Sequence, residues 1–76
     1  PAYVKTPLVE QQIAAQAKEH NLSEQQVVEQ IMLAPMPQKA FIGVEEIAAT
    51  AAFLCSPAAR HITAQTMVLD GGWTAR

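Results

Sequence analysis

Residues 62–73, ITAQTMVLDGGW, decide the fold class of this chain. The centre of this segment, residues 66–69, is a short apolar run with β-branched members and no alternating polar face. Such a run is typical of a strand that is buried on both faces, in a parallel sheet covered by helices. A lone strand leaves its backbone N–H and C=O groups unpaired, and the rest of the chain offers no clear partner. The segment therefore predicts an α/β protein whose other strands lie outside these 76 residues.

A first helix is predicted over residues 7–20. Thr6 fits its N-cap, and Pro7 fits its first position, where the missing N–H costs nothing and the fixed φ suits a helix. Asn21 is suited to the left-handed conformation that ends many helices. The predicted apolar stripe of this helix consists of Val9, Ile13 and Ala17.

A second helix is predicted over residues 24–33. Ser23 and Gln26 have the spacing of a capping box, and Leu22 and Val27 that of the hydrophobic staple that accompanies it. The side chains that this helix is expected to bury are Val27, Val28, Ile31 and Met32. Together these signals predict a pair of short helices joined by a tight turn.

Residues 34–43 read as an ordered connector, because two prolines in close succession exclude both a regular helix and a central strand. A third helix is predicted over residues 44–55, followed by one more helical turn over residues 56–60. Its buried face is expected to contain Ile47, Ala51 and Leu54. The single cysteine, Cys55, is interpreted as a small buried hydrophobic residue.

Composition excludes several classes of function. With Asp+Glu at 7, Lys+Arg at 5 and the cations scattered, the chain has no basic patch for nucleic acid or a membrane surface. No apolar run approaches the roughly 18 residues of a membrane span, and no secretory signal opens the chain, so we expect a cytoplasmic protein. His20 and His61 are far apart without paired ligands, which argues against a metal site. The start at Pro1 favours a fragment of a longer protein.

Two stretches in order, PAYVKTPL and FIGVEEIAATAAFLCSPAARHITAQTMVLDGGW, resemble the C-terminal part of short-chain dehydrogenases/reductases. The resemblance implies the end of a Rossmann-type, doubly wound parallel sheet, with residues 1–76 forming the last part of a single domain. Residues 1–6 would leave a strand and form the nicotinamide loop, and residues 7–33 would be two substrate-lid helices. Residues 34–43 would be the connector, and residues 44–76 the sheet-covering last helix and the last strand.

Within the family, the chain is most similar to members that interconvert D-3-hydroxybutyrate and acetoacetate with NAD, a reaction of ketone body metabolism. The glycine-rich fingerprint and the catalytic Ser, Tyr and Lys of the family are not among residues 1–76, so the segment alone should be inactive and the choice between NAD and NADP is set elsewhere. Two alternatives stay open. One is a segment of another short-chain reductase, of the 3-oxoacyl carrier or sugar dehydrogenase type. The other is a free-standing helical module that dimerises through its Ala-rich third helix.

The resemblance assigns cofactor contacts to Pro1, Val4 and Thr6. Backbone groups around Val4 would hold the nicotinamide carboxamide, and the Thr6 hydroxyl would face the cofactor. This arrangement would orient one face of the ring toward the substrate carbon. Fixed geometry between these two groups raises the rate of hydride transfer. For Thr6, a role as helix cap alone is the competing interpretation.

Substrate contacts are implied for Gln12, Tyr3 and Trp73. Gln12 would hydrogen-bond the substrate carboxylate from the lid, and the two aromatic side chains would wall the small pocket. The competing interpretations are a surface glutamine and two aromatic residues of a hydrophobic core. The resemblance also implies a homotetramer assembled through the last helix and the last strand.

Two alanines depart from the family pattern, which has glycine after the first proline and in I-T-G-Q. These are Ala2 and Ala64. If either position has a positive φ, alanine costs on the order of 1 kcal/mol there.

Overall fold

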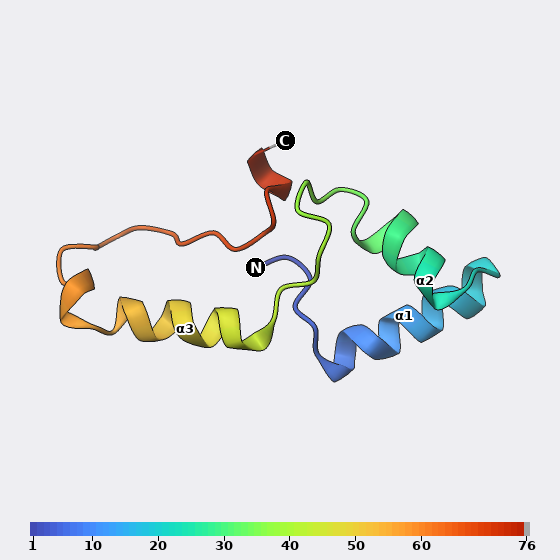
Figure 1. Cartoon of the computed structure of the whole chain (residues 1–76), viewed down its shortest axis with the longest axis horizontal. Coiled ribbons are helices and arrows are strands. Elements are labelled where there is room, and N and C mark those ends of the chain that lie inside the picture. The colour runs from blue at the N-terminus through green and yellow to red at the C-terminus, as the bar shows by residue number, and fades with distance from the viewer. Residues whose placement is uncertain (76) are drawn as a thin grey trace.

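The computed structural model describes residues 1–75, which form an elongated molecule of 49 × 26 × 16 Å with two arms (Figure 1). One arm, residues 7–33, is called the paired-helix arm. It contains three elements: α1 (Pro7–His20), α2 (Glu24–Val27) and the π-helix η1 (Val28–Met32). The helices pack against each other at one end of the molecule.

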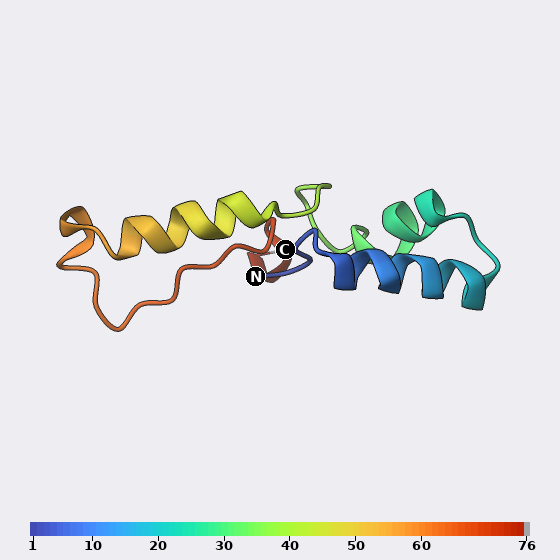
Figure 2. The ribbon, with the colours of Figure 1, turned by 90° about the horizontal axis from the view of Figure 1, so that it is seen from below.

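The other arm, residues 44–69, is called the single-helix arm. It contains α3 (Val44–Leu54), the short 3₁₀-helix η2 (Pro57–Ala59) and an irregular segment that returns beside α3. Between the arms, residues 1–5, 34–43 and 70–75 form the junction, and the last of these includes the 3₁₀-helix η3 (Trp73–Ala75). Figure 2 shows from a second direction that both ends of the described chain lie at this junction.

The sequence prediction for α1 is confirmed at both ends. The Thr6 hydroxyl oxygen accepts a hydrogen bond from the Val9 N–H at 3.3 Å, and Pro7 occupies the first turn. Asn21 ends the helix in the left-handed conformation with φ of 54°. These caps satisfy backbone groups that the helix itself cannot pair.

The capping box that begins α2 is also confirmed. The Ser23 hydroxyl oxygen accepts from the Gln26 N–H at 3.1 Å, and the Gln26 side-chain oxygen accepts from the Ser23 N–H at 2.9 Å. Beyond Val27, however, the predicted α-helix is a π-helix, in which the Leu33 N–H donates to the Val28 carbonyl oxygen at 2.8 Å. Met32 is fully buried, as predicted, whereas the predicted burial of Ile31 is wrong: its side chain is exposed, because π-helical bonds join residues five apart and change the face that each residue presents.

A small hydrophobic core holds the paired-helix arm together. It consists of the buried side chains Val9, Ile13, Val27 and Met32. Further apolar side chains pack around it: Tyr3, Ala17, Leu22, Val28 and Phe41. The core therefore reaches from the two helices to the junction, through Tyr3 and Phe41.

In the single-helix arm, the predicted burial of α3 is wrong for residues 1–75. No α3 side chain is buried, and Phe53 and Leu54 remain 43% and 42% exposed. Cys55 is likewise exposed, so its interpretation as a buried residue is wrong here. The physical reason is that η2 is the only other helix of the described chain in substantial contact with α3. The helix forms, but nothing within this part of the chain covers its apolar face.

The predicted last strand is not formed within residues 1–75. Residues 66–69 have no regular secondary structure, and the first three of them are exposed. Their backbone link to the rest of the chain is a hydrogen bond from the Ala2 N–H to the Leu69 carbonyl oxygen, at 3.0 Å. A strand is defined by its pairing, and one hydrogen bond is not a ladder. The parallel sheet therefore stays a prediction.

Candidate functional site

At the junction, the N-terminal segment pairs with the connector in a short parallel bridge. The Ile42 N–H donates to the Tyr3 carbonyl oxygen at 3.0 Å, and the Lys5 N–H donates to the Ile42 carbonyl oxygen at 2.8 Å. Backbone groups of successive residues in an extended segment point to opposite edges. The N–H and C=O of Val4 therefore point away from Ile42. One donor and one acceptor are left at the residue predicted to hold the carboxamide.

A tight turn at residues 70–74 packs on the connector, which supplies one side of this bridge. The Asp70 carboxylate accepts hydrogen bonds from the Gly72 N–H at 2.9 Å, the Thr74 N–H at 2.9 Å and the Thr74 hydroxyl at 2.5 Å. These donors, led by the Thr74 hydroxyl, hold the pKa of the Asp70 carboxyl below its ordinary value. Asp70 was not among the predicted site residues. The D-x-G spacing with a hydroxyl residue four positions after the aspartate is the signal that could have revealed it.

The two glycines of this turn are required by its backbone. Gly71 and Gly72 have φ of 61° and 89°, in the region that L residues rarely adopt. A Cβ on Gly71 would also lie 2.5 Å from the Cε of the fully buried Met36. The Gln38 N–H donates to the Gly71 carbonyl oxygen at 2.8 Å. The turn is therefore packed directly on the connector.

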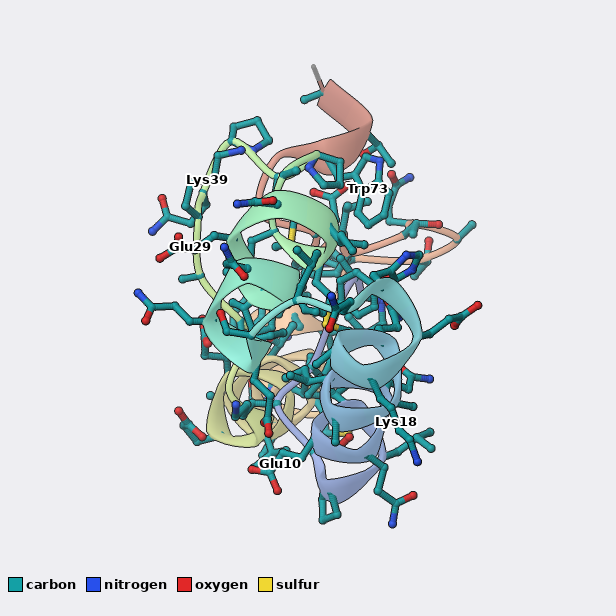
Figure 3. The ribbon with its side chains drawn as sticks, turned by 90° about the vertical axis from the view of Figure 1, so that its right-hand side faces the viewer. Glu10, Lys18, Glu29, Lys39 and Trp73 are labelled. Carbon is teal, nitrogen blue, oxygen red and sulfur yellow. The ribbon has the colours of Figure 1, made fainter. Side chains whose placement is uncertain are left out.

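Tyr3 and Trp73, the two aromatic residues predicted to wall the substrate pocket, meet at the junction. Their ring centroids are 6.1 Å apart, with 34° between the planes. Tyr3 also packs against the core of the paired-helix arm. Figure 3 shows Trp73 in the C-terminal turn. The aromatic pair thus connects that turn with the two helices.

An open hollow of about 320 Å³ lies against the turn. Its lining consists of Pro1, Ala2, residues 66–70, Trp73 and Thr74. Pro1, predicted to contact the cofactor, and Trp73, predicted to contact the substrate, therefore line one cavity. Most of the remaining lining comes from the segment predicted to be the last strand.

Thr6 and Gln12 are placed differently. The Thr6 hydroxyl caps α1, and a hydroxyl that accepts one hydrogen bond still has a proton to donate. Gln12 is exposed on α1, and its side chain makes no hydrogen bond within residues 1–75. The helix that carries Gln12, α1, extends away from the junction (Figure 1), and Gln12 is not among the residues that line the hollow. Its substrate role stays a prediction.

Among residues 1–75, no three His, Cys, Asp or Glu side chains gather in a way that could hold a metal ion. None of the helices over the same range combines the length and the apolar character needed to cross a membrane.

Ala64 has φ of 56°, whereas Ala2 does not have a positive φ. The alanine in place of the family glycine in I-T-G-Q therefore carries the backbone strain expected for that position, and the alanine after Pro1 does not.

Comparison with known proteins gives the family. Residues 1–74 match the family model described as enoyl-(acyl carrier protein) reductase. All 76 residues align with D-beta-hydroxybutyrate dehydrogenase of Rhizobium meliloti at 46% identity and with that of Cupriavidus necator at 36%. They also align with the uncharacterized oxidoreductase YxjF of Bacillus subtilis at 43% identity. The chain spans 30% of the length of each of these three relatives. The chain belongs to the short-chain dehydrogenase/reductase family.

Proposed function

We propose that the chain is the C-terminal part of an NAD-dependent oxidoreductase that interconverts D-3-hydroxybutyrate and acetoacetate. Family membership implies a Rossmann-type fold, to which residues 66–69 would contribute the last strand. The observation that carries the proposal is the 46% identity with a D-beta-hydroxybutyrate dehydrogenase over the whole chain, including the paired-helix arm. That arm is where members of such a family would differ in substrate.

The nicotinamide ring fits the backbone at Val4. A carboxamide presents one carbonyl acceptor and an NH₂ donor, which complement the N–H and C=O of Val4 that face away from Ile42. When bound, the nicotinamide ring accepts or releases the hydride. Val4 would fix the rotation of the nicotinamide ring, and Pro1 would limit the path of the chain beside the ring. The Thr6 hydroxyl proton would be available for a hydrogen bond to the cofactor. All three contacts would orient the nicotinamide ring, and this orientation would be the chain's contribution to hydride transfer.

The substrate side is proposed to consist of Tyr3, Trp73 and Gln12. The Tyr3 and Trp73 rings, which are in contact, would form an aromatic wall that helps to exclude water from the reacting centre. The Gln12 amide N–H groups would donate to the substrate carboxylate when the paired-helix arm closes as a lid. Tyr3 touches both the core of that arm and Trp73, so closure of the lid and the pocket wall would be mechanically linked.

A subunit interface is proposed for the single-helix arm, within a homotetramer. Large apolar side chains are exposed along it: Val44, Phe53, Leu54, Ile62, Met67 and Val68. An apolar surface of this kind is typical of a face covered in the assembled protein. The predicted parallel sheet would cover one part of it and a second subunit another.

A second candidate is a reductase of acyl-carrier substrates, which the description of the matching family model favours. Such an enzyme would use the same nicotinamide loop but would have no free carboxylate to bind. Gln12 would then be a surface residue. The two candidates are separated by the effect of Gln12 on the KM of a small hydroxy acid.

The test is Gln12→Ala in the full-length enzyme, with Gln11→Ala as the matched control because both glutamines are exposed on α1. Loss of a hydrogen bond to a charged group costs about 1.5–3 kcal/mol, so KM for 3-hydroxybutyrate should rise about tenfold or more. KM for NAD should stay unchanged, and Gln11→Ala should change neither constant. Small and equal effects of Gln12→Ala on both constants would remove the carboxylate role.

A further inference from the structure

The turn at residues 70–74 encloses Trp73 between hydrogen bonds to one carboxylate. One Asp70 oxygen accepts from Gly72, the residue before Trp73, and the other accepts from the backbone and hydroxyl of Thr74, the residue after it. The Trp73 N–H itself donates to the Asp70 carbonyl oxygen at 3.1 Å. The backbone on both sides of Trp73 is therefore held by Asp70.

The connector also holds this turn, through Gly71. The Gly71 carbonyl oxygen accepts from the Gln38 N–H, and the Met36 side chain fills the space beneath Gly71. The frame that carries Trp73 is thus fixed to the connector, while the indole ring meets Tyr3. A change in the Asp70 hydrogen bonds would leave the contacts of Gly71 with the connector in place. The backbone that would then be free to rotate is that of the following residues, which include Trp73.

We propose that Asp70 and Thr74 act as a positioning pair that sets the place of the Trp73 indole, and through it the length of the hydroxy acid that the pocket accepts. The proposal rests on the proposed function, in which Trp73 is a wall of the substrate pocket. One methylene group in an apolar pocket changes kcat/KM by about 10–200-fold. A small displacement of the wall therefore changes which chain length is preferred, without a change in the reacting groups.

The chain offers a matched pair of variants for the test. Thr74→Val removes the hydroxyl that donates to Asp70 and keeps the shape of the side chain and the backbone N–H. Thr74→Ser keeps the hydroxyl. Position 74 is exposed, so neither variant opens a cavity in the core. Asp70→Asn is the stronger variant, because it replaces one accepting oxygen with a donating NH₂ group.

Two measurements on the full-length enzyme carry the test. The first is the ratio of kcat/KM for 3-hydroxypentanoate to that for 3-hydroxybutyrate, with NAD. The second is the ¹⁹F NMR signal of 5-fluorotryptophan at position 73, assigned with Trp73→Phe. Thr74→Val and Asp70→Asn should raise the ratio about threefold to tenfold and shift or broaden the Trp73 signal, whereas Thr74→Ser should resemble the wild type in both.

Two results would overturn the proposal. One is a Trp73 signal that is the same in all variants. The other is a fall in kcat/KM for both substrates at a constant ratio, which is the behaviour of residues that only stabilise the turn. Failure of the proposed function is distinguishable, because the wild-type enzyme would then fail to oxidise 3-hydroxybutyrate at all. In that case the chain-length role fails with it, and the NMR signal still decides whether Asp70 and Thr74 position Trp73.

Discussion

The two arms differ in how they use their apolar side chains. The paired-helix arm buries Val27 and Met32 completely against α1, whereas α3 in the single-helix arm buries no residue within the described chain. Both arms nevertheless form helices with well-made N-terminal ends. At the start of α3, the Glu46 carboxylate accepts from the Gly43 N–H at 2.6 Å. Local signals are therefore enough to begin a helix, but only a facing surface can bury it.

The largest effect is expected from breaking the core of the paired-helix arm. Met32→Ala removes a completely buried side chain and should lower the free energy of opening of α1 by about 2–5 kcal/mol. Amide hydrogen exchange of α1 in the full-length protein measures it. The matched control is Met67→Ala in the other arm, which should leave exchange in α1 unchanged. Equal effects of the two variants on exchange in α1 would contradict the assignment of Met32, and not Met67, to the core that holds α1.

A smaller effect is expected from the cap of α2. Ser23→Ala removes the acceptor for the Gln26 N–H and should lower the free energy of unfolding by about 1 kcal/mol. Urea unfolding followed by circular dichroism measures the change. Gln30→Ala, at an exposed position of η1, serves as the control and should change stability by less than about 0.5 kcal/mol.

The single-helix arm contains a position at which a substitution should raise the stability of the protein. Ala64 has φ of 56°, so Ala64→Gly relieves a left-handed alanine and should raise stability by up to about 1 kcal/mol. The melting temperature reports this change. Ala58→Gly lies in η2 and gains no such relief, so it should lower the melting temperature slightly. A fall with Ala64→Gly would show that the strain at this position is absent in solution.

The smallest effect concerns pH at the junction between the arms. The pKa of Asp70 is lower in the folded protein than its unfolded value of about 3.9, so its contribution is fully present above that value and is lost as pH falls through the folded pKa. The difference in melting temperature between wild type and Asp70→Asn should therefore be constant near neutral pH and shrink below about pH 4. A difference that stays constant in acid would contradict the role of the ionised carboxylate.

Sequence alone predicted those parts of the fold that depend on near neighbours. The bounds of α1, the left-handed Asn21 and the Ser23–Gln26 capping box depend on interactions within a few residues, and all are confirmed. The π-helix was missed because an apolar pattern does not distinguish bonds to the fifth residue from bonds to the fourth. The burial of Cys55 was predicted wrongly because burial depends on a distant surface.

The candidate site shows the same division. Tyr3 and Trp73 were named from the family resemblance, and the structure brings their rings together from opposite ends of the chain. The bridge between Val4 and Ile42 could not be predicted, because the register of two short extended segments is set by tertiary contacts and no turn joins them directly. Asp70 was missed because the D-x-G spacing and Thr74 mark the turn only weakly in the sequence, and its hydrogen bonds depend on the path that the turn takes.

The bridge between Val4 and Ile42 has a consequence for how such a protein can diversify. It joins the segment before the paired-helix arm to the connector after it, so the chain between Val4 and Ile42 forms an excursion with tethered ends. A chain excursion with tethered ends is inexpensive to lengthen, since even a doubling of a flexible loop costs only about 0.6 kcal/mol of closure entropy. Helices could therefore be added or exchanged between these two points while the backbone groups of Val4 keep their position.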